Sequence, residues 1–526
     1  MAWNLTVKFG KQLNAVFAEV MPFAGGRENE CRKAAGRGWH EAERKKKMTE
    51  RAMTAAPEAA QVLPARLEPD AIGAAQDTII GMANSAPTVA IGLSLAGLAA
   101  AAAYGSGPVI ILCGIPMLVI ANAYRRLNLW SANCGASFEW VGRAIDPYLG
   151  FLTGWLMIAA SLIAAVAGVV VLAPSVLAIF GGSALSTWPN IFISTAVIVV
   201  LLVIAVAGIR LTARTQVAMG VIEYVILIGF SVWGLVFALG HHHGTFPITG
   251  DWFSLGGIGG QGSLASGLLI AVFMLAGWDA TVYVNEEVKH RRHNPGKAAV
   301  IAVALLIAIY TFSQVGLQGV VSPAKLQANS SSVLVYVAQA LGGGTAAKVM
   351  ALALALSVIA STGVSIVILA RMIYGMASHR VLPSILGNVS PRFATPAIAS
   401  VVVGVILVAV TWIYLLSGSI ANAFTQLIDV TGVLYASFYI LTAFSAIVYY
   451  RRRIFSNAWD AVLVGILPLA AAGFLVWIVV RSWQNAPASQ RWSLFGILMA
   501  GVILMLVARY ILRSSFFRIP RESAPR

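Results

Sequence analysis

The sequence predicts an all-α, polytopic membrane protein. Of its 526 residues, 59% are hydrophobic and only 11% are charged, whereas a soluble domain carries roughly a quarter charged residues. The hydrophobic residues gather in runs of about 20 residues, the length of a membrane-spanning helix. The runs show no period-two alternation, so they do not read as the strands of an outer-membrane barrel.

Twelve spans are expected, with both termini on the cytoplasmic side. Alternate loops hold most of the lysines and arginines, including Arg451–Arg453, whereas the opposite loops hold Lys325, Lys348, Arg481 and Arg491. This bias follows the positive-inside rule, so the net charge of +16 needs no nucleic-acid partner. The expected spans are 72–102, 107–124, 148–179, 189–208, 217–240, 264–287, 298–320, 346–376, 396–417, 422–448, 457–480 and 493–513.

Outside the spans, residues 1–70 are polar and mixed in charge, which predicts a disordered cytoplasmic tail. Residues 1–47 resemble an over-extended start before Met48; the alternative is a genuine regulatory tail. The three cysteines and His241–His243 have no ligand-like spacing, so neither a metal site nor a cofactor is expected. The expected order is the 1–70 tail, a first repeat over 71–240, a second repeat over 241–448, two spans over 449–513 and a cytoplasmic tail over 514–526.

Two expected spans contain helix-breaking residues at corresponding places. Span one reads "IIGMANSAPTVAIG" (79–92), and its Pro87 removes a backbone donor, so the helix should open near residues 83–86. Span six reads "MLAGWDATV" (274–282), with Gly277 as its breaker. The second break follows five spans after the first, as a five-plus-five inverted repeat requires, and paired broken helices of this kind mark transporter sites. The alternative is two ordinary kinked helices.

Four stretches resemble the amino acid–polyamine–organocation permeases. They are "YRRLNLWSANCGASFEWVGRAIDPYLGFLTGW" (124–155), "GIRLTARTQ" (208–216), "GWDATVYVNEEVKHRRHNPGKA" (277–298) and "ARMIYGMASHRVLPSILGNVSPRFATP" (370–396). In the last, His379-Arg380-Val381 departs from the usual acidic-glycine pair. The resemblance implies a LeuT-like fold with discontinuous helices one and six plus two C-terminal helices, and a short amphipathic helix after span two.

For the substrate, the resemblance implies that the first break binds a carboxylate, since free N–H groups and a positive dipole end face it. The carbonyls of the second break would face an ammonium group, and Trp278 would be a lid or a packing residue. The residues concerned are Gly81, Ala83, Asn84, Ser85, Ala86, Ala276, Gly277 and Trp278.

Carboxylates inside spans are candidates for ion coupling, because an unpaired charge in a bilayer is costly. Glu223 falls where some family members carry a lysine, and Ser361-Thr362 of span eight are expected opposite it. Glu223 would exchange a proton, coordinate Na⁺ with these hydroxyls, or serve only structure. Asp279 would accept freed N–H groups or hold a proton. The cluster from Glu286 to Arg292 is expected as an exposed interfacial anchor with loop ion pairs.

The expected function is a secondary active transporter, not an enzyme, that moves an amino acid or related amine across the cytoplasmic membrane by alternating access. Proton coupling is favoured over Na⁺. Alternatives are a polyamine or organocation permease, an amino acid exchanger and a permease-like membrane sensor. The expected partners are the small-molecule substrate and the lipid bilayer, with no nucleic acid and with a monomer or homodimer as the assembly.

Overall fold

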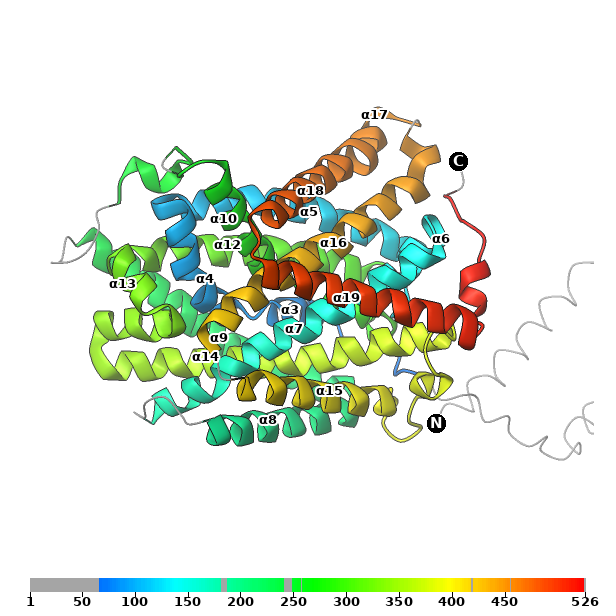
Figure 1. Cartoon of the computed structure of the whole chain (residues 1–526), viewed down its shortest axis with the longest axis horizontal. Helices are drawn as coiled ribbons and strands as arrows, with labels where there is room; N and C mark the ends of the chain where they lie inside the picture. Colours follow the sequence, from blue (N-terminus) through cyan, green and yellow to red (C-terminus); the bar gives the residue numbers. More distant parts are fainter. Residues whose placement is uncertain are drawn as a thin grey trace, which may run out of the picture. The chain divides into compact units, whose positions relative to one another are not determined.

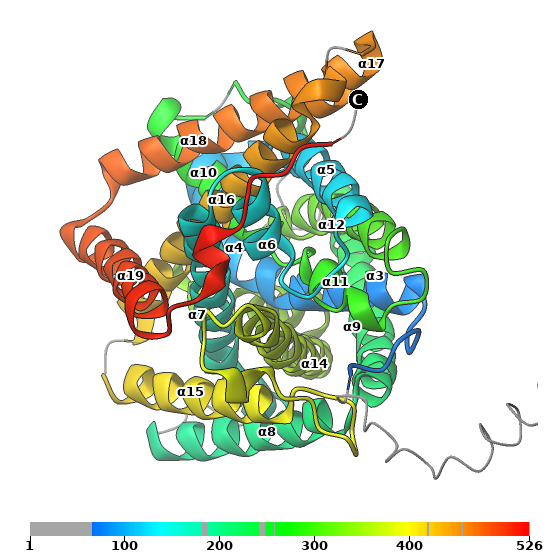
Figure 2. The same ribbon diagram turned by 90° about the vertical axis from the view of Figure 1, so that its right-hand side faces the viewer.

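Long apolar helices make up most of the structure (Figures 1 and 2). The computed structural model describes residues 66–180, 187–240, 248–256, 258–417, 420–454 and 456–524. Within these ranges, 10 helical stretches are long and apolar enough to cross a membrane, and one of them, Ala74–Trp130, contains three helices. The all-α, multi-pass class is therefore confirmed. The expected tail over residues 1–65 and the His241–His243 triplet lie outside the described residues.

The helices of the first half follow the expected spans, although α9 begins at Ile209 instead of residue 217 and α5 ends at Trp130 instead of residue 124. The short helix after span two is present as α6. The elements are α3 (Ala74–Asn84), α4 (Pro87–Ala102), α5 (Ser106–Trp130), α6 (Ala136–Ala144), α7 (Pro147–Ile179), α8 (Thr187–Ala207) and α9 (Ile209–Leu239), with a 3₁₀ turn at Ala103–Gly105.

The second half adds two features that the spans did not predict, the short helix α13 and an early start of α14. Non-helical backbone at Gly342 and Gly343 divides α14 into two helices. The elements are α10 (Gln261–Met274), α11 (Ala280–Tyr283), α12 (Asn294–Gln318), α13 (Pro323–Ala328), α14 (Val333–Ser378), α15 (Ala397–Leu416) and α16 (Ile420–Ile454).

The remaining helices are α17 (Ala458–Asp460), α18 (Leu467–Asn485) and α19 (Ala488–Leu506). Two π-helical segments, Ala461–Ile466 and Val507–Ile511, adjoin them. Single 3₁₀ turns lie at Gly250–Phe253, Asn285–Glu287, Ser330–Ser332, Ser384–Gly387 and Ser515–Arg518.

Local sequence explains where α7 begins. The Asp146 side chain accepts a hydrogen bond of 2.9 Å from the backbone N–H of Tyr148, and Pro147 occupies the first helical position. An N-cap carboxylate satisfies an otherwise free donor, and proline at that position loses no helical bond. The tight turn between α6 and α7 is therefore fixed by three consecutive residues.

Helices five places apart in the order of spans lie against one another. α7 packs on α14, α5 on α12, and α8 on α15, and Figure 2 shows α8 and α15 side by side below α14. α7 and α14 hold many of the buried side chains, so they form the centre of the helical body. The two broken helices, α3–α4 and α10–α11, lie against this centre.

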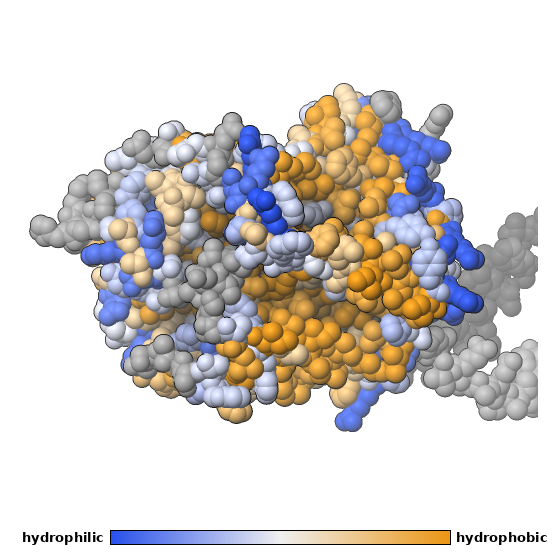
Figure 3. Space-filling model, in the orientation of Figure 1, coloured by the Kyte–Doolittle hydropathy of each residue, from blue (hydrophilic) through white to orange (hydrophobic). Residues whose placement is uncertain are grey.

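The surface of the body is hydrophobic where the peripheral helices lie. Large apolar side chains of α8, α15, α18 and α19 are exposed, among them Val203, Val405 and Ile503. Figure 3 shows a continuous hydrophobic area across the middle of the face that carries α15 and α19, with hydrophilic residues toward the right-hand edge. Such a band is the expected contact with lipid tails.

Candidate functional site

The first break separates α3 from α4 at Ser85 and Ala86. Ala86 has φ 47 and ψ 64, a left-handed conformation, and Pro87 opens the next helix. The freed carbonyl oxygen of Ser85 accepts a hydrogen bond of 3.0 Å from the Tyr310 hydroxyl of α12. The break therefore lies within residues 83–86, as predicted from Pro87. A buried tyrosine satisfies one of its free backbone groups.

The second break separates α10 from α11 over residues 275–279. Gly277 has φ +97, which residues with a side chain rarely adopt. Its N–H donates to the Tyr439 hydroxyl at 3.3 Å, and that hydroxyl donates to Asp279 at 2.8 Å. Tyr439 thus links the unwound backbone to the buried carboxylate.

Asn84 joins the two breaks. Its side-chain amide donates to the carbonyl oxygen of Gly277 at 3.0 Å, and its side-chain oxygen accepts a bond of 3.2 Å from Ser365 of α14. One side chain therefore ties both interrupted helices to α14.

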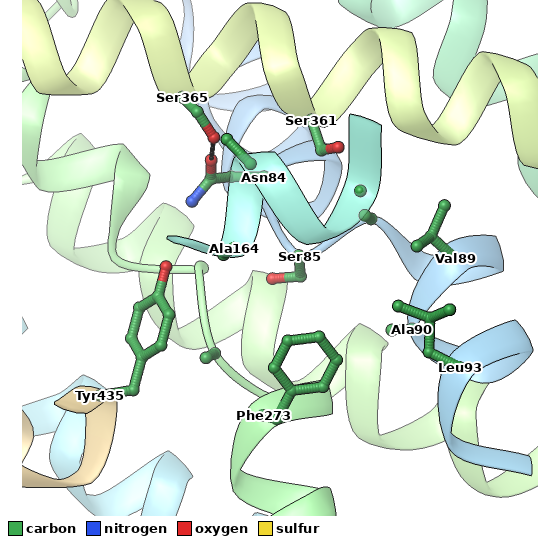
Figure 4. A pocket seen from close by; sticks show the side chains of 14 residues that line it. Asn84, Ser85, Val89, Ala90, Leu93, Ala164, Phe273, Ser361, Ser365 and Tyr435 are labelled. Atoms are coloured by element: carbon green, nitrogen blue, oxygen red, sulfur yellow. Dashed lines mark hydrogen bonds between the residues drawn. The ribbon is translucent and has the colours of Figure 1, made fainter. Parts of the chain in front are cut away.

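A cavity of about 490 Å³ of empty space, part of it open to solvent, lies against the breaks on the side of α4 and α10. Figure 4 shows polar side chains, including Asn84, Ser85 and Tyr435, on one side and the apolar Val89, Ala90 and Leu93 on the other. Among the described residues, no charged side chain lines it. Its full lining is Asn84, Ser85, Ala86, Val89, Ala90, Leu93, Ala164, Ala165, Gly168, Phe273, Ala276, Ser361, Ser365 and Tyr435.

Glu223 of α9 is fully buried at the start of α4. Its Oε1 accepts a hydrogen bond of 2.9 Å from the backbone N–H of Thr88, and the Ser357 side chain lies beside the same carboxylate. Its Oε2 has no hydrogen-bond partner in the described part of the chain. A carboxylate at a helix N-terminus is favoured by the helix dipole, so Glu223 occupies the anion position that α4 offers.

Aromatic side chains close the other side of the breaks. Trp278 is fully buried and stacks on Tyr439 with ring centres 5.2 Å apart, and Tyr124 of α5 meets Trp278 edge-on at 5.0 Å. Offset and edge-to-face contacts of this kind stabilise a packed core. This wall separates the cavity from the region of α6.

Below this wall, a buried ion pair joins the end of the second broken helix to α14. Both carboxylate oxygens of Glu287 accept hydrogen bonds from the Arg371 guanidinium, and both side chains are inaccessible to solvent. The neighbouring Glu286 accepts a bond of 3.0 Å from the backbone N–H of Cys134. The expectation of an exposed interfacial anchor is therefore wrong at Glu287, whose partner lies on another helix.

A family model described as amino acid permease matches residues 77–506, which include both breaks and the whole cavity lining. The chain belongs to the amino acid permease family. The resemblance seen in the four sequence stretches is thereby confirmed.

Named members of the family are distant relatives of this permease. The D-serine/D-alanine/glycine transporter of Escherichia coli K12 is 24% identical over 66% of this chain and 74% of its own length. The methylthioribose transporter of Bacillus subtilis is 23% identical over 72% of this chain and 82% of its own length. The human Asc-type amino acid transporter 1 is 28% identical over 26% of this chain and 25% of its own length.

The fold of the permease is similar to that of a solved structure. The crystal structure of MhsT in complex with L-phenylalanine gives a TM-score of 0.54 at 16% identity, and it covers 79% of this chain and 99% of that one. The likeness is one of fold, since the sequence identity is low.

The structure brings together some of the residues predicted for the substrate and separates others. Asn84, Ser85, Ala86 and Ala276 line the cavity, whereas Gly277 lies behind it as the acceptor of the Asn84 bond. The others do not line it: Gly81 packs on Thr281 and Trp278, while Ala83 and Trp278 are buried in the core. Trp278 is thus a packing residue in this structure, not a lid.

The predicted coupling residues are also divided. Glu223 faces Thr88 and Ser357 instead of Ser361-Thr362. The Ser361 hydroxyl donates to the carbonyl oxygen of Val358 at 3.2 Å and lines the cavity. Thr362 is fully buried. Because Ser357 precedes Ser361 by one helical turn, the right face of α14 but the wrong turn was assigned to Glu223.

The sequence did not predict nine of the fourteen residues that line the cavity, among them Phe273, Ser365 and Tyr435. It also did not predict Tyr439, which accepts the hydrogen bond from the Gly277 N–H. The two tyrosines are four residues apart on α16, so they share a helix face. Polar aromatic residues at that spacing inside an apolar span were a signal that could have been used. Phe273 and Ser365 had no such signal.

Proposed function

We propose that this permease is a secondary active transporter of neutral amino acids that works by alternating access. The observation that carries the proposal is the cavity at the junction of the two broken helices. It has polar side chains at one end, an apolar wall and, in the ranges that the structure describes, no charged lining side chain. Unwound backbone inside a membrane is tolerated where it lines such a cavity.

The groups at the cavity suit a zwitterion. The C-terminal end of α10, which carries Phe273 and is followed by Ala276, presents the negative end of a helix dipole toward an ammonium group. The Thr88 N–H is fixed in direction and already bonded to Glu223. The substrate carboxylate would instead meet the hydroxyls of Ser361 and Ser365, which can rotate away from their present acceptors, the carbonyl oxygen of Val358 and the side-chain oxygen of Asn84. This replaces the earlier expectation that α4 itself binds the carboxylate.

A polyamine is less well matched to this cavity. Such a substrate needs carboxylates in its path, but Asp279 is bonded to Tyr439 and Glu223 to Thr88, and neither lines the cavity. The names of the relatives, which include D-serine, D-alanine and glycine transport, favour small neutral substrates for this chain as well.

The proposal includes twelve spans in a five-plus-five inverted repeat, with both termini cytoplasmic. The packing of α5 on α12, α7 on α14 and α8 on α15 supports the repeat, since each pair occupies corresponding places in the two halves. In this orientation the cavity faces outward and the wall of Trp278 and Tyr439 faces the cytoplasm. Glu223 is the proposed proton-coupling residue, with Na⁺ as the alternative ion.

The test is a thermal-shift screen of the purified protein with neutral amino acids, charged amino acids and polyamines, followed by uptake of the binders into liposomes. A ligand that binds the folded state raises the melting temperature. We expect neutral amino acids to raise it and to be taken up. A response to polyamines alone would overturn the substrate class, and binding without flux would favour a membrane sensor.

A further inference from the structure

The segment Ser514–Ala524, which follows α19, lies along α6 and the adjoining helix ends; we call it the strap. Its Ser514 hydroxyl donates to the carbonyl oxygen of His379 at the end of α14, at 2.7 Å. Its Ala524 N–H donates to the carbonyl oxygen of Tyr449 of α16, at 2.8 Å. Figure 2 shows the strap passing in front of α6 toward the end of α16. The tail expected over 514–526 is therefore, over its described part, bound to the ends of α14 and α16.

Two contacts fix the strap to α6. The Arg143 guanidinium donates two hydrogen bonds to Glu522, at 2.9 and 2.8 Å, and the Glu522 N–H donates to the Arg143 carbonyl oxygen at 2.8 Å. Phe516 is buried and stacks on Phe138 with ring centres 4.3 Å apart. The Phe516 ring occupies the space that a Cβ on Gly142 would need. A two-pronged charged pair and a fitted aromatic ring make a specific contact.

The opposite side of α6 holds the second broken helix. Cys134, just before α6, donates its N–H to Glu286, and the Asn285 amide donates to the carbonyl oxygen of Asn133 at 3.0 Å. Within α6, the Ser137 hydroxyl accepts a bond of 3.3 Å from Tyr283 of α11. Because α11 and the turn after it adjoin the unwound segment, α6 connects the strap to the substrate site.

We propose that the strap is a latch that holds α6 against α11 and so stabilises the state in which the cytoplasmic side is closed. The inference rests on the proposed alternating-access transport. Opening toward the cytoplasm requires α11 and the turn after it to separate from α6 or to move with it. The strap holds α6 and also contacts α7, α14 and α16. It therefore resists both movements, so loss of the strap shifts the population toward the inward-open state.

Two buried cysteines report on the two sides of the molecule. Cys134 lies beside Glu286 at the junction of α6 with the second broken helix, whereas the Cys113 thiol of α5 lies near the carbonyl oxygen of Leu268 in α10, at 3.9 Å. Burial, together with Glu286 and Glu287, raises the pKa of the Cys134 thiol, so it reacts slowly in the closed state. Inward opening exposes Cys134 and leaves Cys113 covered.

The test measures alkylation of both cysteines by N-ethylmaleimide, residue by residue with mass spectrometry, in the full chain carrying C31S and reconstituted in liposomes. Three variants weaken the latch: Glu522→Gln, Phe516→Ala and, from the α6 side, Gly142→Ala. Arg521→Gln is the matched control. The Arg521 side chain also belongs to the strap, but it is 69% exposed, and its guanidinium lies no closer than 3.7 Å to the Asp146 carboxylate. An exposed pair of this kind contributes little.

We expect the latch variants to raise the Cys134 rate about tenfold, as loss of a charge-assisted pair implies, with Cys113 and the Arg521→Gln control unchanged. Equal rises at both cysteines would mean general loosening and would overturn the latch, as would no rise at Cys134. The readout needs no substrate, so a failure of amino acid transport leaves it intact. An error in the latch alone would likewise leave uptake by the wild type unaffected.

Discussion

The Asn84 side-chain amide donates a hydrogen bond of 3.0 Å to the carbonyl oxygen of Gly277, which lies 193 positions later in the sequence. This bond makes the two helix breaks a single structural unit. A movement of one half-helix therefore displaces the other. The proposed substrate site consequently depends on the backbone conformation of Gly277.

Gly277→Ala should disable transport. The added Cβ would lie 3.0 to 3.1 Å from atoms of Asn84, on a backbone with φ +97 that alanine rarely adopts. Strain of this kind costs on the order of 1–3 kcal/mol, so we expect uptake to fall by about tenfold or more. Gly229→Ala is the control, since nothing lies within 4 Å of its Cβ position. Normal uptake by the Gly277 variant would contradict the role given to the break.

Gly168→Val should narrow the substrate range. Gly168 lines the cavity, and the nearest atom to a Cβ there is the Ser361 hydroxyl oxygen at 4.0 Å, so the fold tolerates the change while the cavity loses space. We expect affinity for large neutral amino acids to fall by about tenfold, the cost of a clash of roughly 1.4 kcal/mol, while glycine uptake persists. Gly496→Val is the control, because a Cβ at Gly496 would meet no atom within 4 Å. It should change neither the affinity for large neutral amino acids nor the uptake of glycine.

Glu223→Gln should separate driven accumulation from exchange. Glutamine keeps an oxygen for the Thr88 N–H, which Glu223 Oε1 now accepts at 2.9 Å, but it cannot exchange a proton. We expect accumulation driven by a pH gradient to be lost and counterflow exchange to remain, in a paired transport assay. Asp70→Asn, a change of an exposed carboxylate that precedes α3, is the control. Undiminished accumulation in the Glu223 variant would remove it from the coupling mechanism.

Arg371→Met should lower stability more than a double replacement does. The Glu287–Arg371 pair is inaccessible to solvent, and removal of one member leaves an unpaired buried charge at a cost of about 3–5 kcal/mol. Glu287→Met together with Arg371→Met leaves no charge and should recover much of the loss. Melting temperatures in detergent measure both. If the single change is the milder one, Glu287 has another partner.

The stabilising contribution of Glu139 should disappear in acid. Burial opposes its ionisation, but hydrogen bonds and charge from His379 and Arg143 outweigh burial and lower the pKa of the Glu139 carboxyl below its ordinary 4.5. A carboxyl with a lowered pKa in the folded state contributes stability above its unfolded pKa and loses it as the pH falls through the folded pKa.

The measurement for Glu139 compares melting temperatures of wild type and Glu139→Gln from pH 7 down to pH 3. We expect the variant to melt lower by about 2 °C at pH 7 and the difference to shrink below pH 4.5. A difference that grows in acid would show that Glu139 is destabilising when charged.

Local chemistry made the broken helices predictable. Pro87 forces a break whatever surrounds it. Gly277 alone is a weak signal, but its position five spans later indicates a second break that corresponds to the first. The family followed from motifs with fixed order. The short α6 was predicted by resemblance alone. Its nine residues are too few for a hydrophobic periodicity to identify a helix.

Non-local pairing made the rest unpredictable. Trp278 could equally have faced the cavity, since a tryptophan side chain is apolar on its faces and polar at one edge. The prediction that Glu287 is exposed was wrong because its partner, Arg371, lies 84 residues later in the sequence. Ser357 and Ser361 lie one turn apart on α14, so only the tilt of α9 against it decides which one meets Glu223.

The separation of Glu287 and Arg371 also sets an order of events during synthesis. The Glu287 carboxylate leaves the ribosome 84 residues before its guanidinium partner, so it must wait in water at the membrane surface until α14 arrives. Neither group can be buried alone at tolerable cost. The half of the second broken helix that ends near Glu287 therefore settles after α14 has been inserted, and the proposed substrate site is completed late in biogenesis.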